Sequence, residues 1–146
     1  MLHWSSLAIA RTLPSVNREV IIECLRSSVE GPVAAYLFGS VARGDDHPES
    51  DLDVALLASR PLEPVRRWEV QERLAAAVGR DVDLVDLRAA SAVLRVRVLA
   101  DAALLWASGD AGRESFEAFA LADDARLNEK RQGILDDIER LGSVHG

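Results

Sequence analysis

The chain has 146 residues, of which 49% are hydrophobic and 28% are charged, a composition that excludes a disordered or collagen-like protein and fits one globular domain. Acidic residues outnumber basic residues by 24 to 17, for a net charge of -7, so duplex nucleic acid is not expected to be a direct partner. A single cysteine and three scattered histidines exclude a disulfide framework and a zinc cluster. We recognise neither a membrane span nor a signal peptide, and therefore expect a cytoplasmic protein with no membrane partner.

Helices and strands are predicted to alternate along the chain, because short apolar runs are separated by Gly, Pro and polar turns. In chain order, the expected elements are a helix over 14–28, a strand over 33–38, a turn over 39–44, a strand over 51–57, a helix over 61–78, a strand over 82–85, a helix that includes 93–99, a short edge strand over 103–107 and one or two helices over 112–141. Either Asp86 or Ser91 can cap the helix that includes 93–99. The fold class is therefore α/β or α+β, with a small mixed β-sheet flanked by helices.

Two aspartates, Asp51 and Asp53, lie two residues apart at the start of the second predicted strand. Side chains alternate between the faces of a strand, so both carboxylates point the same way. They repel each other on an otherwise apolar strand, and a divalent cation such as Mg²⁺ removes the conflict. Asp83 is a third acid within an apolar strand, so the three carboxylates can meet if these strands are neighbours. Such a trio suits metal-assisted phosphoryl or nucleotidyl transfer.

Asp81 and Asp86 compete with Asp83 for the third position. Alternation places Asp81 and Asp83 on one face of the strand and Asp86 on the other. Asp83 lies deepest in the apolar run, where an unpaired acid is costliest, whereas Asp86 suits a helix cap. We therefore favour Asp83.

The turn after the first predicted strand reads Gly39-Ser40-Val41-Ala42-Arg43-Gly44. A glycine directly after a buried strand lets the backbone approach a ligand closely, and a helix that begins there offers free N–H groups to phosphate. The Ser40 hydroxyl can donate a hydrogen bond to a phosphate oxygen, and Arg43 can neutralise one. An ordinary strand–turn–helix connection, with Ser40 as a cap, explains Gly39 and Ser40 equally well when they are taken alone.

The spacing of Gly-Ser, ten residues and Asp-x-Asp resembles the signature of the DNA polymerase beta-like nucleotidyltransferase superfamily. The two halves read Phe38-Gly39-Ser40 and Ser50-Asp51-Leu52-Asp53, and the segment 82–87 resembles the one that carries the family's third acid. The short chain is most similar to the minimal nucleotidyltransferases. The resemblance implies a polymerase beta-like palm fold in a single domain over 1–146. This domain would comprise a catalytic core over about 15–107 and a C-terminal helical segment over about 112–142.

Many minimal nucleotidyltransferases are antitoxins of a helical HEPN-domain RNase toxin, and members of this group transfer AMP from ATP to a toxin tyrosine. For this chain, the resemblance implies that Gly39 and Ser40 hold the triphosphate and that Arg43 contacts phosphate. The family's metal ligands and catalytic acids correspond to Asp51, Asp53 and Asp83. Asp83 would also help to deprotonate the acceptor hydroxyl. The implied cofactors are Mg²⁺ and ATP, and the implied partner is the toxin.

Two other functions stay open on the sequence alone. The acceptor can be a small molecule, as in aminoglycoside nucleotidyltransferases, although the chain is short for a dedicated acceptor pocket unless a dimer builds it. Alternatively, the chain is a binding-only antitoxin, which blocks the toxin by forming a complex with it. Substitution of Asp51 and Asp53 distinguishes this last function, because a binding-only antitoxin does not need them.

Apolar residues outside the motif are interpreted mainly as core. Trp68, Trp106 and Tyr36 are expected in the interior rather than stacked on an adenine ring. The C-terminal segment carries a stripe at helical spacing, formed by Phe116, Ala120, Leu127, Ile134, Ile138 and Leu141. We expect this stripe to pack against the protein's own sheet, with a partner helix, in a homodimer or on a toxin, as the alternative.

Overall fold

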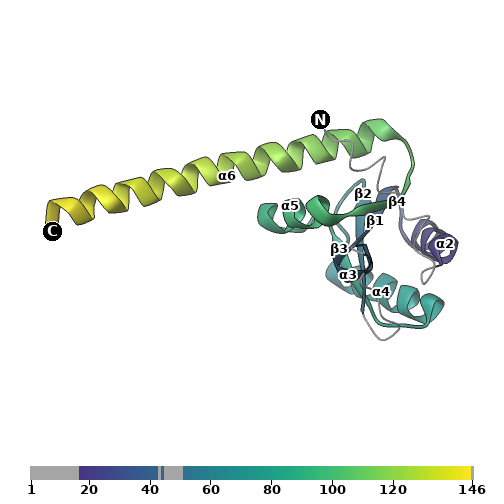
Figure 1. Cartoon of the computed structure of the whole chain (residues 1–146). Coiled ribbons are helices and arrows are strands. Elements are labelled where there is room, and N and C mark those ends of the chain that lie inside the picture. The colour runs from purple at the N-terminus through teal and green to yellow at the C-terminus, as the bar shows by residue number, and fades with distance from the viewer. Residues whose placement is uncertain (1–16, 43, 45–50, 146) are drawn as a thin grey trace.

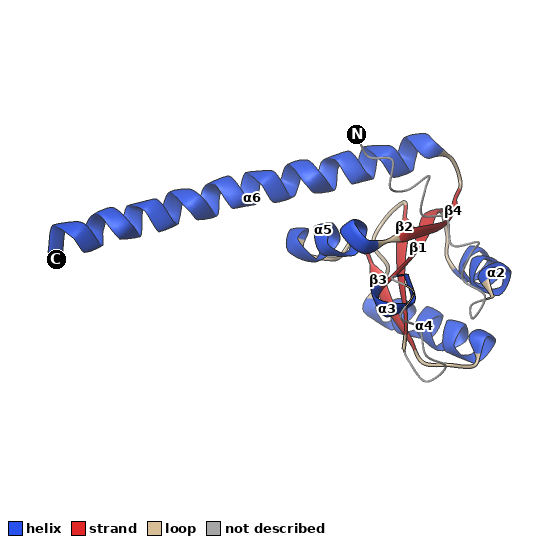
Figure 2. Cartoon of the chain, in the orientation of Figure 1, coloured by secondary structure: helices blue, strands red, loops and turns tan. Residues whose placement is uncertain are grey.

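The computed structural model describes residues 17–42, 44 and 51–145, and the side chains of these residues up to 142. Its centre is a four-stranded sheet of order β3-β2-β1-β4. The strands are β1 (Pro32–Phe38), β2 (Leu52–Ala58), β3 (Val82–Asp86) and β4 (Ala103–Ala107). β1 pairs antiparallel with both β2 and β4, whereas β2 and β3 run parallel. This mixed sheet with flanking helices confirms the predicted fold class (Figures 1 and 2).

The helices are α2 (Arg18–Ser28), α3 (Gly39–Ala42), α4 (Pro64–Val78), α5 (Ala92–Asp101) and α6 (Asp110–His145). Asn17 caps α2 by accepting a hydrogen bond from the Val20 N–H. α4 begins at Pro64, whose missing N–H costs nothing at a helix start. Ser91 caps α5 by accepting from the Leu94 N–H. Of the two caps that the sequence allowed for α5, Ser91 is therefore the one used.

Both faces of the sheet are covered, which explains the nearly continuous apolar runs of its two central strands. Leu37 and Val54 belong to a core that α2 and α4 close from one side. Tyr36 and Ala55, one residue along each strand, belong to a second core with α5 and the start of α6. The sheet is therefore the middle layer of a three-layer domain.

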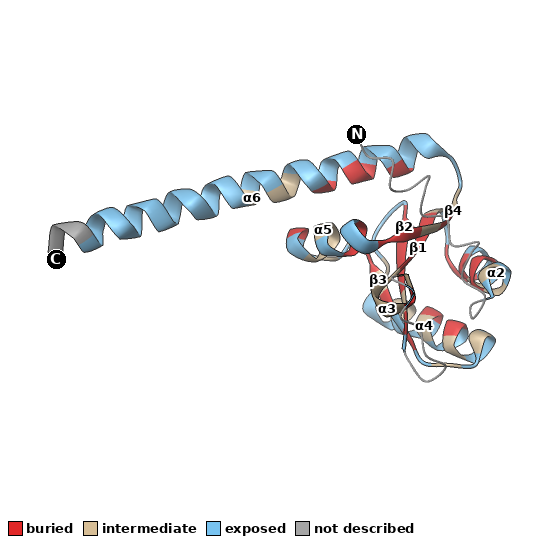
Figure 3. Cartoon of the chain, viewed as in Figure 1, coloured by how far each residue is buried: buried red, intermediate tan, exposed pale blue. Residues whose placement is uncertain are grey.

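α6 is one helix of 36 residues, which corresponds to a length of about 54 Å. Its first turns pack on the sheet and bury Phe116 and Ala120, but residues 128–142 are all exposed. Figure 3 shows this part of α6 extending away from the domain. The predicted packing of the whole stripe on the protein's own sheet is therefore wrong for Ile134, Ile138 and Leu141, because the helix continues beyond the sheet and α5.

A buried polar cluster anchors the start of α6 to the sheet. The Tyr36 hydroxyl donates to Glu117 Oε2 at 2.9 Å, and Arg113 Nη1 forms an ion pair with the same oxygen at 3.1 Å. All three residues are buried. Burial and the Glu117 carboxylate raise the pKa of Tyr36 above its ordinary value, so the phenol stays protonated. The cluster fixes the direction in which α6 leaves the domain.

The prediction that the aromatic residues outside the motif lie in the core is confirmed for some of them and wrong for one. Tyr36 is fully buried, as expected. Trp106 is half-buried against the α2–α4 core, with the Arg26 guanidinium carbon 5.1 Å from its ring centroid. Trp68, however, is 55% exposed on α4, so its prediction as a core residue is wrong. The buried positions of α4 are Val70 and Leu74 instead, because the inward face of this helix is rotated away from Trp68.

Candidate active site

Asp53 and Asp83 are direct partners in the parallel register of β2 and β3. Asp53 is also opposite Phe38, the last residue of β1. Paired residues project from the same face of a sheet, and Phe38 packs against the α5–α6 core. The register therefore brings Phe38, Asp53 and Asp83 into one row on the α5 side of the sheet, at the end where β1 gives way to Gly39.

The Asp53 carboxylate lies against the backbone of Gly39. A Cβ atom built on Gly39 would come within 3.1 Å of Asp53 Cγ, and it would come closer still to Oδ2. Gly39 also has a φ of 73°, a left-handed conformation that other residues adopt only at a cost. Both the close approach and the turn therefore require glycine at this position.

Ser40 and Val41 continue the chain as the short helix α3. Val41 is fully buried, so it fixes this turn to the core, while Ser40 stays half-buried at the sheet end. The Gly44 N–H donates to the Val41 carbonyl at 3.1 Å and closes the turn. Arg43, the predicted phosphate contact, lies outside the residues that the structure describes.

The three predicted acids are brought to the same end of the sheet but not to one point. Asp51 precedes β2 and is exposed, Asp83 is exposed, and Asp53 is half-buried. Within the part of the chain that the structure describes, no three acidic, His or Cys side chains form a group that could hold a metal ion. Like-charged carboxylates repel, so the backbone register alone does not draw their side chains together. The predicted neighbourhood of Asp53 and Asp83 is confirmed, whereas a preformed cluster of three is not.

Asp86 has a structural role that the sequence did not reveal. It is buried, and its Oδ2 atom accepts from the Leu62 N–H at 2.7 Å while Oδ1 accepts from the Arg88 N–H at 3.0 Å. It therefore ties the loop before α4 to the loop before α5. Asp86 was one of two candidate caps for α5, but Ser91 caps that helix. Asp81 remains exposed just before β3. Its backbone carbonyl accepts from the Leu52 N–H at 2.8 Å, which aligns the starts of β2 and β3.

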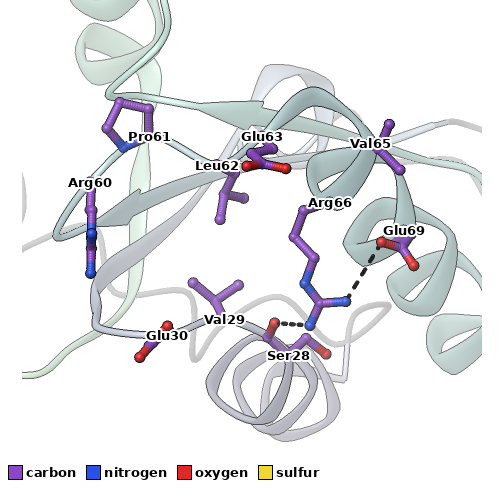
Figure 4. Close-up of a pocket in the computed structure, with 10 residues that line it drawn as sticks. All are labelled: Ser28, Val29, Glu30, Arg60, Pro61, Leu62, Glu63, Val65, Arg66 and Glu69. Atoms are coloured by element: carbon purple, nitrogen blue, oxygen red, sulfur yellow. Dashed lines mark hydrogen bonds and ion pairs between the residues drawn. The ribbon is translucent and has the colours of Figure 1, made fainter.

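A cavity of about 440 Å³ lies at the opposite end of the sheet. Its walls come from the end of α2, the loop after β2 and the start of α4, and Leu62 and Val29 point into it (Figure 4). Arg66 crosses one side, donating to the Ser28 carbonyl and pairing with Glu69 at 3.9 Å. The predicted site residues that the structure describes do not line this cavity, so the candidate active site stays at the other end of the sheet, where Gly39 follows β1.

No described helix is both long and apolar enough to cross a membrane. The long helix α6 fails because charged side chains occur along its whole length.

Comparison with known proteins identifies the family. Residues 19–110 match the family described as Polymerase beta, Nucleotidyltransferase. The protein adenylyltransferase MntA of Shewanella oneidensis is 38% identical over 126 residues, covering 86% of this chain and 90% of the relative. A toxin–antitoxin crystal structure with AMP-PNP matches with a TM-score of 0.76 at 39% identity, covering 84% of this chain and 98% of the other.

A second solved structure is that of a tri-AMPylated Shewanella oneidensis HEPN toxin in complex with an MNT antitoxin. It matches with a TM-score of 0.69 at 37% identity, covering 83% of this chain and 94% of the other. The matched residues 19–110 contain β1, Gly39, β2 and β3, and therefore the whole row described above. The chain thus belongs to the polymerase beta nucleotidyltransferase family, as the Gly-Ser and Asp-x-Asp spacing predicted.

Proposed function

We propose that this chain is a protein adenylyltransferase that transfers AMP from ATP to a tyrosine of a HEPN-family RNase toxin, and that it neutralises the toxin in this way. The observation that carries the proposal is the pairing of Asp53 with Asp83 beside Gly39, in a chain 38% identical to a protein adenylyltransferase. The relatives solved with AMP-PNP and with an AMPylated toxin support the donor and the acceptor.

Nucleotide binding is assigned to the turn after β1. The absence of a side chain at Gly39 lets the Asp53 carboxylate lie directly against this turn, and the Ser40 hydroxyl can donate to a phosphate oxygen. Arg43 is proposed to contact phosphate as a cation. The assignment of nucleotide binding to this turn follows from the spacing of the motif, and the left-handed backbone at Gly39 supports it.

Asp51, Asp53 and Asp83 are the proposed ligands of Mg²⁺. The fit is supported by the chemistry of the donors, since carboxylate oxygens are the ligands that Mg²⁺ prefers, and by the close approach of the Asp53 carboxylate to the Gly39 turn, which only glycine allows. When bound, Mg²⁺ would supply positive charge that balances the acids and the triphosphate. Asp51 and Asp83 are exposed, so a metal ion can reach their carboxylates from solvent.

The proposed reaction is an in-line displacement at the α-phosphorus of ATP. The tyrosine oxygen forms a bond to this phosphorus, the bond to the bridging oxygen of pyrophosphate breaks, and pyrophosphate leaves with that oxygen. The tyrosine proton passes to a carboxylate, for which we propose Asp83. Electrostatic stabilisation of the phosphates by the Gly39–Ser40 turn contributes to the rate.

The domain and its location complete the proposal. We assign the whole chain to one domain, with a catalytic core over about 15–107 and a helical segment over about 112–142. Because the reaction consumes ATP, we place it in the cytoplasm.

The test is an intact-mass spectrum of the cognate toxin after incubation with this protein, ATP and Mg²⁺. The wild-type chain is expected to add AMP to the toxin, and the Asp51→Asn/Asp53→Asn double variant is expected to bind the toxin without adding AMP. Asp81→Asn is the matched control, since it removes an exposed aspartate at the same end of the sheet. Transfer by the double variant at the wild-type rate would refute the site, and neutralisation by that variant without transfer would indicate a binding-only antitoxin.

A further inference from the structure

The part of α6 that extends beyond the domain carries large apolar side chains on its surface. Leu135 is 51% exposed, Ile134 54%, Ile138 59% and Leu141 61%. Leu127, Ile134, Ile138 and Leu141 follow one another at intervals of seven, four and three residues, the spacing of a seam between two paired helices. We call these four residues the α6 seam; nothing within the described chain covers its last three members.

The seam belongs to a helix whose base is anchored to the domain. The buried cluster of Tyr36, Arg113 and Glu117 holds the base of α6 against the sheet. The helix then continues in one piece to His145, as Figure 1 shows. An exposed apolar stripe on a helix of this length favours a partner that covers it.

The charges that flank the seam form two blocks of opposite sign. The basic block, residues 126–131, contains Arg126, Lys130 and Arg131 with one acid, Glu129. The acidic block, residues 136–140, contains Asp136, Asp137 and Glu139 with one base, Arg140. The apolar residues Ile134 and Leu135 lie between the blocks.

We propose that the α6 seam pairs with the α6 seam of a second copy of this chain, with the two helices antiparallel. A two-fold axis near residue 134 places the basic block of each copy beside the acidic block of the other. Because of the symmetry, this attractive contact occurs twice in the dimer. A parallel pair would instead align like charges. Charge complementarity therefore favours a second copy in the antiparallel orientation.

Lys130 and Asp137 give the sharpest prediction of this arrangement. Each immediately precedes a seam-facing position of the helix, and in antiparallel pairs such flanking residues lie beside their counterparts in the partner helix. Lys130 is the only lysine of the chain, and the described residues supply it with no ion-pair or hydrogen-bond partner. Asp137 is exposed and contacts Arg140 one turn further along. We expect Lys130 of each copy to pair with Asp137 of the other.

The experiment measures the mass of the full-length chain in solution by sedimentation equilibrium, without toxin or ATP. The wild type is expected to dimerise, and Ile134→Glu/Ile138→Glu is expected to raise the dimer dissociation constant at least about 100-fold, because it buries charge in the seam. Val93→Glu is the matched control: Val93 is also an exposed apolar residue of a helix, at 42%, but lies on α5. Far-ultraviolet circular dichroism verifies that each variant keeps its helices.

A charge exchange tests the orientation. Lys130→Glu is expected to weaken the dimer about tenfold, since two symmetric ion pairs become repulsive. The double variant Lys130→Glu/Asp137→Lys is expected to restore dimerisation, because both pairs form again with reversed sign. A failure of this rescue would overturn the antiparallel arrangement.

A wild-type chain that stays monomeric at every concentration would overturn the proposal as a whole. If the monomeric chain loses toxin binding on Ile134→Glu/Ile138→Glu, the seam belongs to the toxin interface instead. Self-association is measured without toxin or nucleotide, so its failure is distinct from a failure of the proposed adenylyl transfer.

Discussion

A single side-chain carbon on Gly39 would overlap the carboxylate of Asp53. The Asp53 carboxylate group lies where that carbon would be, with Cγ 3.1 Å from it. Because Gly39 directly follows β1 and Asp53 is paired with Phe38, the last residue of that strand, any displacement at Gly39 moves the proposed nucleotide turn and the proposed metal ligand together. The two residues therefore act as one geometric unit.

Gly39→Ala is expected to reduce AMP transfer at least about 100-fold, because the added carbon displaces Asp53 and misplaces the reacting groups. It should also lower the free energy of unfolding by about 1–2 kcal/mol, the cost of a left-handed conformation for a residue with a Cβ. The measurements are the transfer rate by mass spectrometry and urea unfolding.

Gly79→Ala is the matched control for this variant. Gly79 has nearly the same φ, 72° against 73°, but nothing lies within 4 Å of the carbon that alanine would add. It should show only the loss of stability that the left-handed backbone causes, with unchanged transfer. Equal activity of the two variants would remove Gly39 from the site.

Asp83→Asn is expected to lower the transfer rate on the order of 100-fold without destabilising the fold. The reason is its place beside Asp53 in the register of β2 and β3, combined with an exposed side chain that contributes little to packing. Asp81→Asn, two residues earlier and also exposed, should keep the wild-type rate. The opposite order of effects would assign the third acid to Asp81.

The strands and the row of acids could be predicted from sequence because both depend on local pattern. Short apolar runs predict the strands. An acid within such a run is costly to bury, so Asp53 and Asp83 stood out as candidate functional residues. Asp83 lies beside Asp53 only because β3 is the parallel neighbour of β2. Their predicted proximity depends on this adjacency, and the structure meets the condition.

The remaining features depend on contacts that no local pattern contains. Ile134 and Ile138 have the same helical spacing as the buried Phe116, and only the extent of the sheet decides which of them is covered. Asp86 is a buried acid in an apolar strand, as a functional residue would be, yet it satisfies two loop N–H groups. Tyr36 and Glu117 meet across 81 residues of sequence, so the anchor of α6 is visible only in the folded chain.

Asp86→Ala should therefore destabilise the fold without affecting the chemistry. The Leu62 and Arg88 N–H groups lose their acceptor, and the expected fall in the free energy of unfolding is about 2–4 kcal/mol. Urea unfolding measures this value, with Asp81→Ala as the exposed control. Transfer per folded molecule should equal that of the wild type at a temperature where both are folded, and a specific loss of activity would instead place Asp86 in the site.

The raised pKa of Tyr36 predicts a loss of stability in alkali. Desolvation by burial, followed by the nearby Glu117 carboxylate, disfavours the phenolate in the folded chain. The unfolded chain therefore loses its phenol proton first, near the ordinary pKa of about 10. The stabilisation is complete below that pH and is lost as the pH rises above it.

The expected result is a free energy of unfolding that falls from about pH 10 upward in the wild type and falls less in Tyr36→Phe. At neutral pH this variant should itself be less stable by about 1–2 kcal/mol, because a hydrogen bond to a charged acceptor is lost. Tyr36 is the only tyrosine, so ultraviolet titration of the folded protein reports its ionisation directly. An ordinary pKa in that titration would mean that Tyr36 is not held against Glu117, and that the base of α6 is not anchored as described.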